Sequence, residues 1–124
     1  MRLRVLLVAA GWVCGGCLLS TAVHAEMDAA TFLKRYDEAN PATQKYMETR
    51  IGDIENGMSW ANAVLLNRNQ PLIFCPPDSL VLTGEQLVDI LRREIKEEPL
   101  EGTLGAFPAA LLIALEKVFP CHPK

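Results

Sequence analysis

Residues 41–67, PATQKYMETRIGDIENGMSWANAVLLN, decide the fold of this chain. Apolar residues recur along them in steps of 4, 3, 4, 3 and 4, which is the period of one face of an α-helix. Asn40 is a favoured helix cap and Pro41 suits a first helical position, so we expect a long helix from there to about Asn67. Its expected buried face comprises Met47, Ile51, Ile54, Met58, Ala61 and Leu65.

Two glycines, Gly52 and Gly57, lie inside this predicted helix. A glycine within a helix is less favourable than alanine by roughly 1 kcal/mol, because it leaves the unfolded backbone more freedom. We expect each of them to allow a close approach by another helix.

A shorter helix is expected before the long one, and a loop after it. Residues 28–39 place three apolar side chains at helical spacing, with charges elsewhere, namely Phe32, Leu33 and Tyr36. Residues 67–82 contain three prolines and no helical period. They predict a loop with at most a short extended stretch, held in place at Cys75.

The third helix is expected to begin after Thr83. Thr83 and Gln86 have the spacing of a capping box, in which each side chain bonds to the other residue's backbone amide. Pro99 ends the helix, since proline cannot continue it. The apolar stripe of this helix comprises Leu87, Val88, Leu91 and Ile95, with Ile90 on its flank.

The last helix is expected over residues 107–118, because Pro108 lies near its start and Pro120 follows its end. Its middle, residues 109–115, is apolar throughout, and a helix that is apolar all round is buried on all sides. In so small a domain, a second subunit would have to cover part of it, so we predict a homodimer. Four helices with short connections predict an all-α domain.

The first 25 residues have the layout of a secretory signal peptide. Two arginines precede an apolar stretch, which ends in small residues. We expect cleavage between Ala25 and Glu26, which leaves residues 26–124 as one domain. The chain would then act outside the cytoplasm.

Two of the four cysteines lie in the segment expected to be removed. They form the pattern Cys14-Gly-Gly-Cys17, which in a mature chain would resemble half of a redox or zinc site. Because of its location we assign it no such role. An uncleaved membrane anchor, and a lipoprotein in which Cys17 is lipidated, remain alternative interpretations of this segment.

Cys75 and Cys121 are the cysteines that remain after cleavage. An even number of cysteines in an exported chain predicts disulfide bonding, because the environment outside the cytoplasm is oxidising. Only one intramolecular pairing exists, and it joins the loop before the third helix to the end of the fourth. Closing a loop of about 47 residues stabilises a domain by about 4 kcal/mol.

The charge balance is acidic. The full chain has 12 basic and 15 acidic residues, and loss of Arg2 and Arg4 with the first 25 residues leaves 10 basic residues and a net charge of −5. Such a domain lacks the basic surface that would attract nucleic acids or anionic membranes. We therefore expect neither as a partner, and no membrane span after cleavage.

The residues predict no catalytic, cofactor or metal site, and hence no enzyme. Nucleophilic catalysis needs a base beside the nucleophile, and the cleaved chain has one histidine, His122, near its C-terminus. Together with Cys75 and Cys121 it supplies three metal ligands, two of them adjacent. Asp53 and Glu55 are two residues apart on a helix, so they face different ways and cannot share a substrate.

An acidic cluster and two large aromatic residues have simpler expected roles. The cluster, Glu94, Glu97, Glu98 and Glu101, lacks the Asp/Asn/Gly alternation of a calcium loop, so we expect a solvated helix face. Trp60 and Phe107 are expected to be core or interface anchors rather than ligand platforms.

The C-terminal half carries a recognisable set of residues. Phe-Cys-x-Pro is followed by Thr-x-x-Gln-Leu-Val, then Pro-Ala-Ala, and a final helix that ends in Phe-Pro-Cys, at Phe74, Cys75, Pro77, Thr83, Gln86, Leu87, Val88, Pro108, Ala109, Ala110, Phe119, Pro120 and Cys121. This stretch resembles the Rap/Tai family of immunity proteins, which are associated with type VI secretion. The N-terminal half departs from the family, because Tyr36 and Met47 stand where it has a second pair of cysteines.

The resemblance implies a small helical periplasmic protein, often a dimer, that binds and neutralises a peptidoglycan-cleaving amidase effector. Recognition would lie in the loop Asn67 to Ser79 or in the link Pro99 to Phe107, since loops on rigid scaffolds commonly carry binding residues. Two alternatives stay open: an acid-stress periplasmic chaperone of the HdeA type, and an envelope protein with another partner on the same scaffold.

Overall fold

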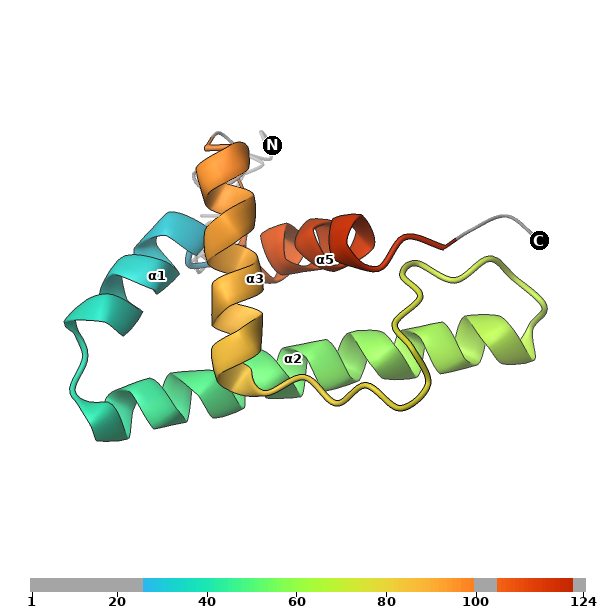
Figure 1. The fold of residues 1–124 in the computed structure, drawn as a ribbon, viewed down its shortest axis with the longest axis horizontal. Coiled ribbons are helices and arrows are strands. Elements are labelled where there is room, and N and C mark those ends of the chain that lie inside the picture. The colour runs from blue at the N-terminus through green and yellow to red at the C-terminus, as the bar shows by residue number, and fades with distance from the viewer. Residues whose placement is uncertain (1–25, 100–104, 122–124) are drawn as a thin grey trace, which may run out of the picture.

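The computed structural model describes residues 26–99 and 105–121, and within these residues the chain forms four α-helices. In chain order they are α1 (Ala29–Glu38), α2 (Pro41–Asn67), α3 (Gly84–Glu97) and α5 (Phe107–Val118). In Figure 1, α2 runs along the length of the molecule, α3 crosses it steeply, and α1 and α5 lie on opposite sides of α3. The predicted all-α class and helix order are confirmed.

Side-chain caps fix where the helices begin. The Thr43 amide donates to Asn40 Oδ1 at 2.9 Å, and Pro41 occupies the first turn of α2, as expected. The predicted capping box of α3 is also present, with the Gln86 amide donating to Thr83 Oγ1 at 3.2 Å and the Thr83 amide donating to Gln86 Oε1 at 2.9 Å. These caps satisfy backbone amides that have no partner inside the helix.

The core lies around α3, which packs against the other three helices. Leu87, Val88 and Leu91 of α3 are fully buried, as the predicted stripe required. Ile51 of α2 and Phe74 of the following loop are also fully buried. The remaining core side chains come from α1, α3 and α5, namely Ala29, Phe32, Leu33, Ile90, Ala110, Leu111, Ala114 and Leu115.

The expected buried face of α2 is correct over its first part and wrong near its C-terminal end. Met47, Ile54 and Met58 pack against the core, but Ala61 is exposed and its neighbour Asn62 is buried. A polar residue at a buried position interrupts the apolar period, so the pattern pointed to the adjacent alanine.

Among the described residues, no other helix comes close to the glycines of α2, so the expected close approach within the chain is not found. A Cβ atom on Gly52 or Gly57 would meet no atom within 4 Å. The close contact lies instead at Gly84, the first residue of α3, where a Cβ atom would come within 2.5 Å of the Glu48 backbone oxygen. α3 therefore begins directly against α2, and the glycine that permits this lies outside α2.

α5 is less buried than its sequence implied. Ala110, Leu111, Ala114 and Leu115 face the core, whereas Ala109 is exposed and Leu112 and Ile113 are half-buried. α1, α2 and α3 cover the buried face within one chain. Burial of α5 therefore needs no second subunit, and this reason for expecting a homodimer is removed.

Two further features complete the frame. An isolated antiparallel bridge pairs Asp28 with Ala106, and the Phe107 amide donates to the Met27 carbonyl at 2.9 Å, so the start of α1 lies beside the start of α5. In the part of the chain that the structure describes, the helices are all too short or too polar to cross a membrane.

Candidate functional site

The predicted disulfide between Cys75 and Cys121 is present, with the two Cα atoms 5.0 Å apart. Next to it, the Cys75 amide donates to the Phe119 carbonyl at 2.8 Å. The bond joins the α2–α3 loop, residues 68–83, to the segment that follows α5. Together the covalent bond and the hydrogen bond hold the middle of a loop that has no regular structure of its own.

Asn62 is a second attachment point for this loop, and the sequence did not reveal it. Its side chain is buried, accepts a hydrogen bond from the Ile73 amide at 2.8 Å, and donates to the Phe74 carbonyl at 2.7 Å. One asparagine thus satisfies both a donor and an acceptor of loop backbone that would otherwise be left without partners. Its position pins the loop beside the fully buried Phe74 ring.

Beyond the disulfide the loop turns outward and presents apolar side chains. The Leu80 amide donates to the Pro77 carbonyl at 2.9 Å, which closes a turn after the two prolines. Leu80 is 40% exposed and Val81 is 84% exposed, immediately before the cap of α3. We call Leu80 and Val81 the exposed loop pair, and it projects from backbone that is fixed on both sides.

A second group of exposed apolar residues lies on α2. Trp60 is 68% exposed and Val64 is 45% exposed, and a spacing of four places them on one face of the helix. Ala61 and Gly57 are exposed on the same side. We call these four residues the outer face of α2; Trp60 is therefore not a core residue, whereas Phe107 stacks on Phe32 with ring centroids 4.5 Å apart.

Apolar packing of Tyr36 and Met47 and polar contacts of Tyr36 join α1 to α2. Tyr36 and Met47 both pack against the core. The Tyr36 hydroxyl donates to Glu48 Oε1 at 2.8 Å, and Gln44 Nε2 donates to the Tyr36 carbonyl at 3.0 Å. The bond to the Glu48 carboxylate raises the pKa of Tyr36 to about 12 and lowers the pKa of Glu48 below its usual value.

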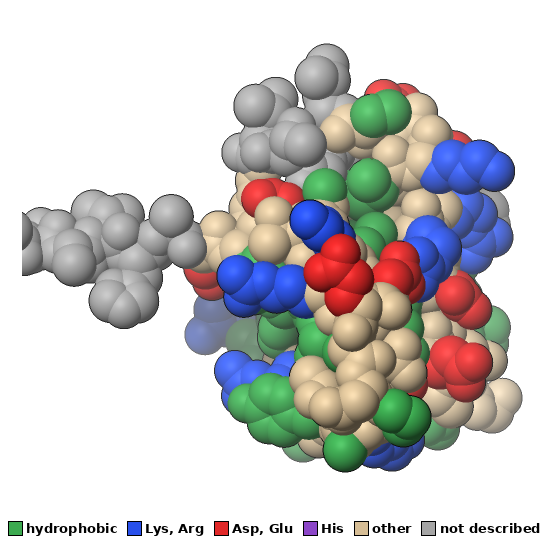
Figure 2. Space-filling view, turned by 90° about the vertical axis from the view of Figure 1, so that its left-hand side faces the viewer, with side chains coloured by type: hydrophobic (Ala, Val, Ile, Leu, Met, Phe, Trp, Pro, Cys, Tyr) green, Lys and Arg blue, Asp and Glu red, His purple; other side chains and the backbone are tan. Residues whose placement is uncertain are grey.

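Two other carboxylates also hold α1. Arg92 of α3 donates two hydrogen bonds, at 2.8 and 2.9 Å, to the Asp37 carboxylate, and these bonds lower the pKa of Asp37. Asp28 caps α1 by accepting from the Thr31 amide at 2.7 Å and from its hydroxyl at 2.9 Å, which lowers the pKa of Asp28. On the side where α1 lies, Figure 2 shows basic and acidic side chains interspersed rather than gathered by sign.

Because the pKa values of these three carboxylates are lowered, we expect acid to weaken the attachment of α1 to the rest of the fold. A lowered pKa in the folded state means that the ionised form stabilises the fold above the usual carboxyl range, about pH 4, and that this contribution is lost as the pH falls. We expect the free energy of unfolding, from urea titrations followed by circular dichroism, to fall below about pH 4, with α1 amides exchanging first.

The matched control for this effect is Asp37→Asn, which removes one of the three groups without changing its size. This variant should be less stable than the wild type at neutral pH and lose less stability between neutral and acid pH. Identical pH dependence in the two proteins would show that the Asp37–Arg92 pair does not contribute. High salt should reduce the difference, because both side chains are about half exposed.

The acidic cluster is not the uniformly solvated face that we expected. The Glu94 side chain is only 3% exposed and accepts from Lys117 Nζ of α5, whose side chain is about half exposed, so the two form a partly buried ion pair between α3 and α5. Glu97 and Glu98 are exposed, and Glu101 lies outside the described residues. Sequence pattern missed the pair because its cation is 23 residues away along the chain.

The residues considered as catalytic or metal-binding groups lie in different parts of the structure. Among residues 26–99 and 105–121, no three His, Cys, Asp or Glu side chains are grouped as metal ligands. Cys75 and Cys121 are joined to each other, and His122 lies outside the described residues, as does Ala25 at the expected cleavage site. Glu55 accepts from the Ser59 hydroxyl at 2.7 Å on α2 itself, and Asp53 is exposed.

Comparison with known proteins adds no relative. No family model, no curated protein and no solved structure matches this chain.

Proposed function

We propose that this chain is a periplasmic immunity protein, which binds a peptidoglycan-cleaving amidase effector of type VI secretion and neutralises it without catalysis. One observation carries the proposal: the exposed loop pair, Leu80 and Val81, projects from a loop that is fixed by a disulfide, by Asn62 and by the cap of α3. The resemblance of residues 74–121 to the Rap/Tai family supplies the class of partner.

A fixed loop suits a stoichiometric inhibitor for a physical reason. A loop that is already ordered loses little conformational entropy when it binds, so more of the contact energy appears as affinity. Exposed apolar side chains such as Val81 provide the desolvated centre that a tight protein interface needs. The proposed recognition element is therefore the α2–α3 loop, and it includes Leu80 and Val81, which lie just beyond the range Asn67 to Ser79 expected from the sequence.

Export through a signal peptide of residues 1–25, with cleavage before Glu26, belongs to the same proposal. The Cys75–Cys121 disulfide supports it, because such bonds persist in oxidising compartments. A non-catalytic role is supported by the engagement of both cysteines with each other, which leaves neither as a thiol nucleophile.

The first test is whether an amidase is encoded beside this gene; its peptidoglycan hydrolysis is then measured while it is titrated with the protein purified after expression of the full chain. We expect inhibition that is complete at one molecule of protein per molecule of enzyme. Val81→Asp should weaken inhibition at least tenfold, because it places a charge in the proposed apolar contact. Val64→Asp, the same change on the outer face of α2, is the matched control.

Three results would contradict the proposal in different ways. No inhibition by the wild-type protein would remove the immunity function. Full inhibition by Val81→Asp together with loss of inhibition by Val64→Asp would move recognition from the loop to α2. Complete inhibition by far less than one molecule of protein per molecule of enzyme would indicate that the protein acts catalytically, and would contradict a binding mechanism.

A homodimer forms part of the proposal, now through the outer face of α2. Trp60 and Val64 are exposed, and the space around Gly57 is open, so a second helix could pack closely there. Light scattering at micromolar concentration should report a dimer for the wild type and a monomer for Val64→Asp. A monomeric wild type would exclude the dimer and leave inhibition by the loop untouched.

The acid-stress chaperone is the second candidate, and the carboxylates that hold α1 favour it. Acid would weaken the bonds of Asp28, Asp37 and Glu48, and release of α1 would uncover core residues such as Phe32. A protein of this kind suppresses aggregation of an unfolded client at low pH. Failure to do so under acid conditions where α1 has loosened would exclude it.

A further inference from the structure

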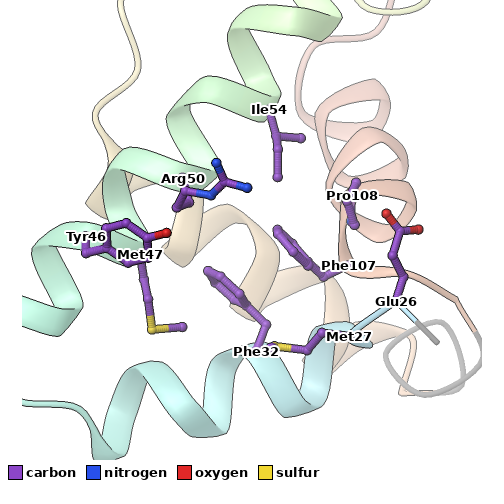
Figure 3. A pocket seen from close by; sticks show the side chains of 9 residues that line it. All are labelled: Glu26, Met27, Phe32, Tyr46, Met47, Arg50, Ile54, Phe107 and Pro108. Carbon is purple, nitrogen blue, oxygen red and sulfur yellow. The ribbon is translucent and has the colours of Figure 1, made fainter. Parts of the chain in front are cut away.

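A pocket of about 390 Å³ lies where the start of the described chain, α1, α2 and the beginning of α5 meet. Figure 3 shows side chains from all four segments pointing into it. Its volume is at the lower end of the range of small-molecule sites, roughly 300–1,000 Å³. The pocket is separate from the exposed loop pair and from the outer face of α2.

The floor of the pocket is apolar and preformed. Phe32 and Phe107 stack with their rings 16° from parallel, and Phe32 is 3% exposed. Met27, Met47 and Ile54 line the walls and are each partly buried. Unbranched methionine side chains adapt to irregular apolar shapes, so walls of this kind fit a flexible hydrocarbon chain.

One basic side chain reaches over this apolar surface. Arg50 of α2 lines the pocket, and Figure 3 shows its guanidinium group extending into the space between Ile54 and Phe107. The guanidinium forms no hydrogen bond or ion pair with the residues that the structure describes. Glu26 lines the opposite edge beside Pro108 (Figure 3), so the two charges are not directed at the same position.

We propose that this pocket binds a single-chain anionic amphiphile of the fatty-acid type. The hydrocarbon chain lies on the Phe32–Phe107 floor between the two methionines, where it removes apolar surface from water. The carboxylate pairs with the Arg50 guanidinium, whose planar fork matches a carboxylate with two parallel hydrogen bonds. The volume suits one acyl chain, and the Arg50 guanidinium favours an anionic head group.

The test uses decanoate as the probe and the protein purified after expression of the full chain. Isothermal titration calorimetry should detect binding of decanoate, and decyltrimethylammonium, with the same chain and a cationic head, should bind at least tenfold more weakly. Arg50→Gln should weaken decanoate binding roughly tenfold and leave decanol binding unchanged, because decanol carries no charge for Arg50 to pair with. Arg50 is exposed, so this variant retains the fold.

Methionine methyl signals locate the bound probe. In protein with labelled methionine methyl groups, decanoate should shift the Met27 and Met47 signals and leave Met58 of the same α2 helix unmoved, since Met58 does not line the pocket. No binding of decanoate would overturn the proposal. Equal binding of the cationic probe would overturn the anionic assignment, and shifts confined to Met58 would overturn the location.

Discussion

Replacement of both Cys75 and Cys121 by serine is expected to lower the free energy of unfolding by about 4 kcal/mol. The two residues are 46 positions apart, and the bond between them limits the freedom of the unfolded chain over that whole length. A small domain has a total stability of about 5–15 kcal/mol, so this loss is a large share of it. Urea unfolding, followed by circular dichroism at neutral pH, measures the change, and Tm should fall by roughly 15–30 °C.

The wild-type protein under reducing conditions is the control. It should unfold at the same urea concentration as the serine double variant, and reduction should leave the double variant unchanged. If the wild type kept its midpoint after complete reduction, the bond would contribute nothing to stability. A decrease in the free energy of unfolding well above about 4 kcal/mol would show that Phe74 also leaves the core when the disulfide is absent.

The expected loss also bears on recognition. Without the bond, the loop keeps its attachment through Asn62 and through the cap of α3, but its middle is free to move. Leu80 and Val81 would then have to be ordered during binding, and ordering costs roughly 1–2 kcal/mol of backbone entropy for each residue. Inhibition of the amidase by the double variant should therefore weaken even at temperatures where the helices remain folded.

Local sequence signals predicted the helices of this chain well. Asn40, Thr83 and the prolines act within a few residues of their own positions, and each of them fixed a helix end that the structure confirms. The disulfide followed from counting cysteines after an expected cleavage, and it needed no knowledge of geometry. Features of this kind depend on neighbours in sequence or on a single remaining partner.

The features that sequence missed depend on partners far away along the chain. Asn62 is buried because loop backbone 11 and 12 residues later needs a donor and an acceptor. Glu94 is buried because Lys117 reaches it from another helix. A polar residue on an apolar helix face interrupts the hydrophobic period. The period gives no information about a partner elsewhere in the chain that satisfies the hydrogen bonds of this residue.

The candidate sites show the same limit. Trp60 was expected to be a core or interface anchor, and only the fold shows that Trp60 and Val81 are both exposed. The pocket brings Arg50 of α2 together with Phe107 of α5, which are separated by more than half of the described chain. No local motif marks a site assembled in this way. The disulfide was predictable because a cysteine forms such a bond only with another cysteine, and only two cysteines remained.

Replacement of Asn62 by alanine is the second prediction with a large expected effect, a loss of about 2–4 kcal/mol in the free energy of unfolding. The Ile73 amide and the Phe74 carbonyl would both lose their partner, and a buried backbone group without a hydrogen bond costs about 1–3 kcal/mol. Asn62 itself is 7% exposed, so water does not replace the side chain easily. Urea unfolding with the disulfide intact measures the loss.

Asn67→Ala is the matched control, because Asn67 is an exposed asparagine at the end of the same helix and should change stability by less than about 0.5 kcal/mol. Asn62 and the disulfide hold neighbouring parts of one loop, so their effects should not add. We expect the loss caused by Asn62→Ala to be smaller in the serine double variant, because that loop is already free to rearrange and solvate its backbone. Strict additivity would show that the two attachments act independently and that the loop does not respond as one unit.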